Sequence, residues 1–148
     1  CISLQNGLAQ NPKHEFRATW LATVANIDWP ETKATDATTR NQQKKELTDI
    51  FDKMVAGNMN AVCMQVRSLC DAMYQSSYEP WSVALTGTRG KDPGYDPLAF
   101  AIEEAHKRGM KIMVDVVLNH TGYEASTKEY YNTKKGYGFY GSKAYKNN

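Results

Sequence analysis

Three short segments of the chain carry the patterns that are typical of β-strands. Residues 15–24 alternate apolar with polar side chains and are rich in aromatic and β-branched types. Residues 60–66 and 111–118 are apolar runs of strand length, the second of which is interrupted by Asp115. The pattern therefore predicts three strands, the third apolar enough to be buried on both faces.

Two helices are predicted between these strands. The first has an apolar stripe at helical spacing, formed by Leu47, Ile50, Phe51, Met54 and Val55. Thr39 and Gln42 are available as a capping box ahead of this stripe, and Gly57 is placed to end the helix. The second helix is expected to begin at Asp96, a favourable N-cap residue, and to end near Gly109.

Strands separated by helix-length connections predict a parallel sheet, because a parallel crossover needs about a dozen residues or more. The fold class is therefore α/β, either an open doubly wound sheet or a (β/α) TIM-type barrel. A closed barrel takes about 250 residues, so the 148 residues here would form only its N-terminal portion, with about three strands and two helices. A receiver-like signalling domain is disfavoured, because Thr23, Ala25 and Asn26 stand where an acidic pocket is needed.

Composition divides the chain into three parts. Residues 1–13 are expected to be an N-terminal tether, residues 14–120 the barrel portion and residues 121–148 a loop excursion. The last part has six tyrosines and five lysines but no Leu, Ile or Val, so it lacks the side chains that build a core. It is interpreted either as a solvated loop or as an excursion that stacks on sugars.

Charge and motif content exclude several classes of function. With 18 basic and 16 acidic residues, the net charge of +2 is too balanced for a nucleic-acid partner to be expected. No apolar run approaches the roughly 20 residues that span a bilayer. The sequence around residues 90–91 fails as a phosphate-binding loop, and neither GxSxG nor HExxH occurs.

The three cysteines are too few for a disulfide scaffold, and no pair has CxxC spacing. Cys63 and Cys70 are interpreted as a core thiol and a loop thiol. Cys1 stands first in the sequence, as in a mature bacterial lipoprotein cut just before its lipid-bearing cysteine, with an arbitrary start as the alternative. The protein is therefore expected in the cell envelope or secreted, and a possible lipid on Cys1 would be its only attachment to a membrane.

Polar and aromatic residues gather after the predicted strands. Asp115 interrupts an apolar strand, where a carboxylate is costly unless it is paired or hydrogen-bonded. Asn119 offers a carbonyl oxygen to a cation such as calcium, and His120 can donate hydrogen bonds to a hydroxylated ligand. Four residues supply flat rings that can stack on a pyranose: Trp29, Tyr74, Tyr78 and Trp81. Three supply polar groups that can bind its hydroxyls: Asp28, Arg67 and Asp71. Each alone is explained by packing, but together they favour a site for glycans.

The stretch DVVLNH at residues 115–120 resembles the first signature region of the α-amylase superfamily of glycoside hydrolases, which are (β/α) barrels. The resemblance implies that Asp115 and His120 contact the sugar where cleavage occurs. It also implies that Asn119 contributes to a structural calcium site. A long excursion follows this strand in that superfamily, at the position where the Tyr/Lys/Gly segment begins here.

A longer resemblance covers roughly residues 14–112. The segments EFRATWLATVANIDWP, NAVCMQVR and DAMYQSSYEPWSVALTGTRGKDPGYDPLAFAIEEAHKRGMKI are very similar to the family-10-like glycosyl hydrolases, also catalogued as domain of unknown function 187. The resemblance implies a secreted or lipid-anchored (β/α) barrel acting on glycans, including peptidoglycan stripped of its peptides. That family continues with a tryptophan and an Asn-Pro pair where residues 115–120 stand here. The chain is therefore either a mosaic of two related barrels or a family-10-like scaffold with an amylase-like third strand.

Both resemblances imply a glycoside hydrolase, or a truncated part of one, that acts on O-glycosidic bonds of a polysaccharide such as an α-glucan or a peptidoglycan glycan strand. Such enzymes normally need two carboxylates flanking the scissile bond. In the α-amylase superfamily these lie on later strands, and no spacing of acidic residues identifies a pair here. The catalytic residues are therefore left unassigned, and a non-catalytic glycan-binding surface lipoprotein is the alternative function.

Overall fold

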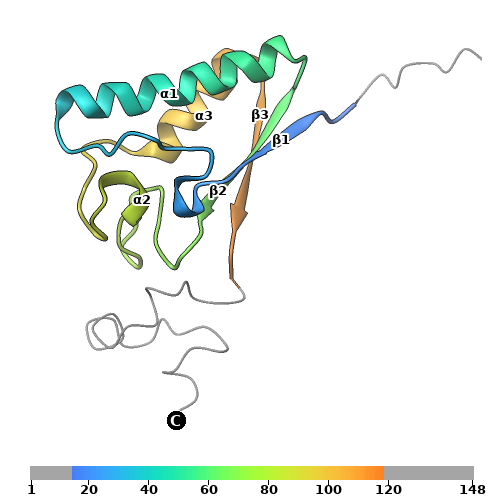
Figure 1. The fold of residues 1–148 in the computed structure, drawn as a ribbon. Helices are drawn as coiled ribbons and strands as arrows, with labels where there is room; N and C mark the ends of the chain where they lie inside the picture. Colours follow the sequence, from blue (N-terminus) through green and yellow to red (C-terminus); the bar gives the residue numbers. More distant parts are fainter. Residues whose placement is uncertain (1–14, 119–148) are drawn as a thin grey trace, which may run out of the picture.

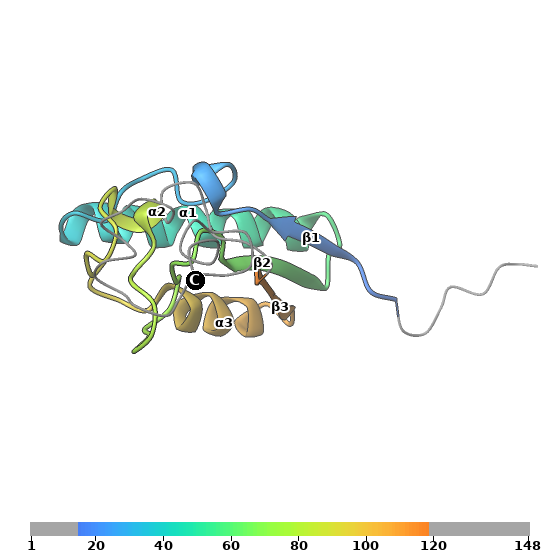
Figure 2. The same cartoon turned by 90° about the horizontal axis from the view of Figure 1, so that it is seen from below.

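The computed structural model describes residues 15–118, which form a three-stranded parallel sheet with helices on one side (Figure 1). The strands are β1 (Ala18–Leu21), β2 (Ala61–Arg67) and β3 (Lys111–Val116), in the order β1-β2-β3. Helices α1 (Ala37–Ala56) and α3 (Pro97–Lys107) connect successive strands and cover the same face (Figure 2). A 3-10 turn, η1 (Val24–Asn26), and a short helix, α2 (Val83–Thr86), lie in the segments that follow β1 and β2.

The predicted α/β class is confirmed, but β1 and β3 are shorter than predicted, and β2 keeps its predicted length one residue further along the chain. β1 ends at Leu21 because the backbone turns at Ala22, whose N–H donates to the carboxylate of Asp28 at 2.8 Å. β3 ends at Val116, where its register with β2 becomes irregular. Three parallel strands in sequential order are compatible with part of a (β/α) fold, and closure into a barrel would need further strands.

The N-cap of α1 is Asp36, so the predicted capping box between Thr39 and Gln42 is wrong. The Asp36 carboxylate accepts from the Thr39 N–H at 2.8 Å, and the Thr39 hydroxyl accepts from the Asp36 N–H at 3.0 Å. This reciprocal pair satisfies two amides that the first helical turn leaves without partners. The end of α1 at Gly57 and the N-cap of α3 at Asp96 are both confirmed.

The hydrophobic core lies between the sheet and the two long helices. β2 is the central strand and points Val62, Met64 and Val66 into the core, where each is at most 1% exposed. The helices supply the facing side chains, among them Leu47, Phe51, Ala101 and Ala105. Full burial of a large apolar side chain contributes about 1.5–3 kcal/mol, so this layer holds both helices against the sheet.

Neither α1 nor α3 covers the opposite face of the sheet, which is called the uncovered face below. Side chains alternate along a strand, so Cys63 of β2 shares this face with Trp20 of β1 and with Met113 and Asp115 of β3. Trp20 is 53% exposed and Met113 is 48% exposed. Cys63, predicted as a core thiol, is therefore only half-buried, whereas the predicted loop thiol Cys70 is buried.

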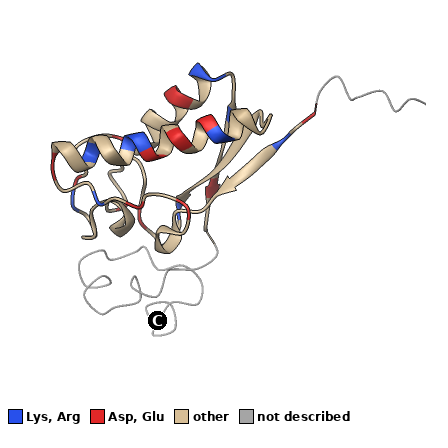
Figure 3. Ribbon diagram, turned by 45° about the horizontal axis from the view of Figure 1, so that its top comes forward, with Lys and Arg blue, Asp and Glu red and all other residues tan. Residues whose placement is uncertain are grey.

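Charges of both signs are interspersed along α1 and α3 (Figure 3). Lys45 pairs with Asp49 along α1, and Arg108 joins the end of α3 to Asp52 of α1 at 2.6 Å. Within residues 15–118, no helix is both long enough and apolar enough to cross a membrane.

Candidate functional site

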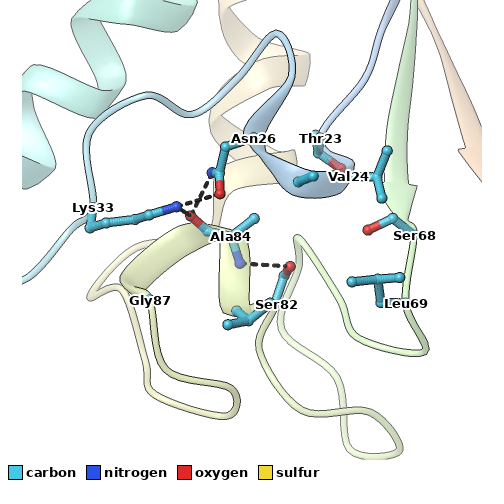
Figure 4. A pocket seen from close by; sticks show the side chains of 11 residues that line it. Thr23, Val24, Asn26, Lys33, Ser68, Leu69, Ser82, Ala84 and Gly87 are labelled. Carbon is cyan, nitrogen blue, oxygen red and sulfur yellow. Dashed lines mark hydrogen bonds between the residues drawn. The ribbon is translucent and has the colours of Figure 1, made fainter. Parts of the chain in front are cut away.

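The segments that follow β1 and β2 enclose a pocket of about 270 Å³ (Figure 4). Its wall is built from η1, the first residues after β2 and the short helix α2. Lining side chains include Val24, Asn26, Lys33, Ser68 and Ser82. The carboxyl ends of parallel strands lie along one edge of a sheet, and ligands of α/β proteins bind beyond that edge. The pocket therefore occupies the position where this fold class places its sites.

A buried network fixes η1 against the end of β2. The Gln65 side-chain carbonyl accepts from the backbone N–H groups of Thr23 at 3.1 Å and Val24 at 2.9 Å. The Thr23 hydroxyl donates in return to the backbone carbonyl of Gln65 at 2.9 Å. Ala25 and Asn26 then adopt positive φ angles of 51° and 55°. Gln65 and Thr23 are almost fully buried, so these bonds are shielded from water and hold the turn in one conformation.

Lys33 reaches the pocket from the loop between η1 and α1. Its ammonium donates to the Asn26 side-chain carbonyl and, at 3.1 Å, to the backbone carbonyl of Ala84 in α2. The Asn26 amide donates to the same Ala84 carbonyl at 3.0 Å and to the Pro30 carbonyl at 2.6 Å. Burial lowers the pKa of Lys33. A cation is thus held at the pocket wall by neutral oxygen atoms.

Arg67, predicted to contact a sugar, instead forms a buried ion pair at the end of β2. Its guanidinium lies 2.5 Å from the carboxylate of Glu79, and the two side chains are 4% and 11% exposed. It also donates to the backbone carbonyl of Val117 and to the Cys70 sulfur at 3.4 Å. Arg67 therefore ties the loop after β2 to the end of β3.

Asp71 and Trp29 were predicted to bind substrate, and the structure buries both completely. Asp71 accepts from the Val83 N–H at 3.2 Å and pairs with Arg89 at 3.5 Å. The Trp29 indole donates to the backbone carbonyl of Gln43 at 3.0 Å. In this structure both side chains hold the loops in place, and neither presents a surface to a ligand.

The aromatic residues of the loop after β2 differ in exposure. Tyr74 and Trp81 are half-buried and pack against the core, while Tyr78 is 68% exposed. Burial raises the pKa of Tyr74. A single backbone bridge joins Ala72 to Trp81 and closes the loop on itself. Of the predicted stacking rings, Tyr78 is thus the one whose surface is mainly in solvent.

Asp115 lies half-buried on the uncovered face of the sheet. The Trp20 indole donates to its carboxylate at 3.0 Å. This bond is the hydrogen-bond partner that a carboxylate in an apolar strand was expected to need. Sequence reasoning placed Trp20 in a strand but gave it no role. The alternation of side chains along β1 and β3 could have identified this contact, because it places Trp20 and Asp115 on one face of the sheet.

Other predicted residues lie outside residues 15–118. They are Cys1, predicted to carry a lipid, Asn119, predicted to bind calcium, and His120, predicted to bind sugar. Among the described residues, no group of three His, Cys, Asp or Glu side chains is arranged to hold a metal ion. Lys33 and Asn26 were missed as pocket residues, because no local pattern distinguishes them from other polar loop residues.

Comparisons with known proteins cover most of this chain. The family described as Glycosyl hydrolase-like 10 matches residues 15–141. Glycosyl hydrolase YngK of Bacillus subtilis (strain 168) is 46% identical over 112 residues, which are 72% of this chain and 21% of that protein. Glycosyl hydrolase DigH of Escherichia coli (strain K12) is 39% identical over 107 residues, which are 70% of this chain and 24% of that protein. The chain thus spans about a fifth to a quarter of the length of these relatives.

The matched family region contains the sheet, both long helices and the pocket. The resemblance to family-10-like glycosyl hydrolases, expected from residues 14–112, is confirmed. The likeness of residues 115–120 to the α-amylase superfamily stays a prediction. Because the family matches residues 15–141 and two proteins named glycosyl hydrolases are 46% and 39% identical to the chain, the chain belongs to the Glycosyl hydrolase-like 10 family.

Proposed function

We propose that this chain is part of a glycoside hydrolase that cleaves O-glycosidic bonds of a polysaccharide, such as an α-glucan or a peptidoglycan glycan strand. The family match carries the proposal, because both relatives are named glycosyl hydrolases. The pocket supports it, because it lies beyond the carboxyl ends of parallel strands, where (β/α) enzymes bind their substrates.

In this proposal the chain contributes the N-terminal strands of a (β/α) barrel and part of its glycan-binding surface. The face that carries Trp20 and Asp115 is the one that would turn toward the barrel interior, since the helices cover the other face. Asp115, His120 and the exposed ring of Tyr78 are the proposed sugar contacts. Asn119 is proposed to contribute to a calcium site, which a direct calcium-binding measurement would test.

The catalytic carboxylate pair is assigned to other parts of the enzyme. A glycosidase needs one acid and one nucleophile or base, placed on either side of the scissile bond. Glu79 is engaged by Arg67, and Asp71 is buried against Arg89. Asp115 accepts a hydrogen bond from Trp20. Because these three carboxylates already bond to protein groups, they also favour the alternative function, a cell-surface protein that binds glycans without cleaving them.

A chimaera with YngK tests the proposal. The 112 matching residues of YngK are replaced by those of this chain, and reducing ends released from soluble α-glucan and from peptide-free peptidoglycan strands are measured. Intact YngK and YngK lacking the segment are the controls. Because the two segments are 46% identical, we expect the chimaera to restore cleavage of the glycan that YngK cleaves.

The isolated 148-residue chain is assayed beside the chimaera. Glycan binding without cleavage by the isolated chain, together with an active chimaera, is the result expected for a barrel segment that lacks the catalytic pair. A folded chimaera with no activity, where YngK is active, would contradict the hydrolase proposal. Glycan binding by the isolated chain in that case would favour the non-catalytic alternative.

A further inference from the structure

The pocket beyond β1 and β2 has an uneven distribution of charge. Lys33 is the charged residue among those that line it, and none of the described lining residues is acidic. Asp28, the carboxylate nearest in sequence to η1, is exposed and accepts from the Ala22 N–H. Among residues 15–118, no carboxylate forms an ion pair with Lys33. The pocket therefore offers a positive charge that the described part of the protein leaves unneutralised.

The Lys33 ammonium has hydrogen-bonding capacity to spare. An ammonium has three N–H donors, and the carbonyl oxygens of Asn26 and Ala84 take two of them. Figure 4 shows the amine at one end of the pocket, between Asn26 and Ala84, with Ser68 across the pocket from it. The Ser82 hydroxyl oxygen accepts from the Ala84 N–H at 3.2 Å, so its own proton is free to donate. The ammonium complements an anionic group, and the hydroxyls can donate to other oxygen atoms of the same ligand.

Size and polarity restrict the ligand. A volume of about 270 Å³ lies just below the roughly 300–1,000 Å³ typical of pockets for drug-sized ligands, so it accommodates one sugar ring and not an extended chain. Val24, Leu69 and Val83 add apolar surface to the wall, which suits the C–H face of a pyranose. A partly buried cation without a counter-ion is unfavourable, and a carboxylate from the ligand would relieve that cost.

We propose that this pocket is a subsite for an acidic sugar, with Lys33 as the residue that binds its carboxylate and with Ser68 and Ser82 as donors to other oxygen atoms of the same sugar. The inference rests on the proposed glycan-hydrolase function and narrows its substrate class to glycans that carry carboxylates. Burial lowers the pKa of Lys33, in keeping with a cation that lacks a neighbouring acid. Neutral glycans would leave the ammonium unpaired and bind less tightly.

The test uses the full chain and three probes in NMR titrations. Methyl α-glucuronide and methyl α-glucoside differ only at C6, which is a carboxylate in the first and a hydroxymethyl group in the second. Acetate supplies the carboxylate without the sugar. Because the Lys33 ammonium can form a hydrogen-bonded charge pair with the carboxylate, we expect the dissociation constant of the glucuronide to be about tenfold lower than that of the glucoside. Acetate is expected to bind more weakly than the glucuronide.

Variants assign the preference to Lys33. Lys33→Met should bind the glucuronide and the glucoside about equally, and Lys33→Arg should retain part of the preference for the glucuronide. Lys111→Met removes the same charge from the opposite end of the sheet and should change nothing. Val24→Asp adds a carboxylate to the pocket wall without touching Lys33, and should abolish the preference while the neutral Val24→Asn retains it. This pair keeps the test decisive if Lys33→Met fails to fold.

Three outcomes would overturn the subsite. Equal binding of glucuronide and glucoside would refute it while leaving the glycan function standing. Binding of acetate as tight as that of the glucuronide would show a general anion site with no part in sugar recognition. Absence of binding for all three probes would refute the subsite, and the YngK chimaera would then decide the proposed function separately.

Discussion

The buried ion pair between Arg67 and Glu79 supports the sharpest stability prediction. The guanidinium places two nitrogens on one carboxylate oxygen, Nε at 2.6 Å and Nη2 at 2.5 Å. The two side chains are only 4% and 11% exposed, so water screens the pair weakly. Removing one partner of such a pair takes the opposite charge away from the other buried group, which costs about 3–5 kcal/mol.

Glu79→Gln should therefore lower the free energy of unfolding by about 3 kcal/mol, the lower end of that range, because the amide still accepts one hydrogen bond. This corresponds to roughly a hundredfold change in the unfolding equilibrium. Arg67→Met should cost more, because the bonds to the Val117 carbonyl and the Cys70 sulfur are lost as well. The double variant should be less destabilised than the sum of the single variants, because neither charge is then left alone.

Urea unfolding of the full chain, followed by circular dichroism, measures these differences. Glu103→Gln is the matched control, since Glu103 and its partner Lys107 are 64% and 56% exposed and such surface pairs contribute about 0–1 kcal/mol. A Glu79→Gln effect no larger than that of Glu103→Gln would refute the reasoning. Strict additivity of the two single variants would also refute it, because it would mean that the pair does not act as a unit.

Three further predictions concern caps and titrating groups. Asp36→Ala removes the carboxylate that accepts from the Thr39 N–H at 2.8 Å, and should lower the urea midpoint measurably, whereas Asp49→Ala on the exposed face of α1 should lower it less. Burial raises the pKa of Cys70 and of Tyr95 above their ordinary values of 9.0 and 10.0, so the folded state keeps protons that the unfolded state releases. The free energy of unfolding should therefore fall as the pH rises above about 9, and more gently in Tyr95→Phe; an unchanged slope in that variant would count against the assignment. Cys70, which is 1% exposed, should react with iodoacetamide at pH 8 more slowly than the half-buried Cys63, and peptide mass mapping would show equal rates if that burial were wrong.

The sequence by itself determined the three strands, the two long helices, their order and the family, but not η1 or α2. The apolar stripe of α1 follows from a period of 3.6 residues, and Leu47 and Phe51 are accordingly buried. The Asp96 cap and the parallel sheet follow equally from local pattern and from the length of the connections. Each of these signals is contained in a short window of the chain, where neighbours along the sequence are also neighbours in space.

Only the tertiary structure decided which way the loop side chains point. Trp29, Arg67 and Asp71 have the residue types of a sugar site, yet the fold turns all three inward to bond with the protein. The pocket depends equally on a distant pairing, since Lys33 meets Ala84, which is 51 residues away. On the uncovered face of the sheet, Trp20 likewise meets Asp115, which is 95 residues away. Local periodicity carries no information about such contacts, because they form only when strands and loops far apart in the sequence are brought to the same edge of the sheet.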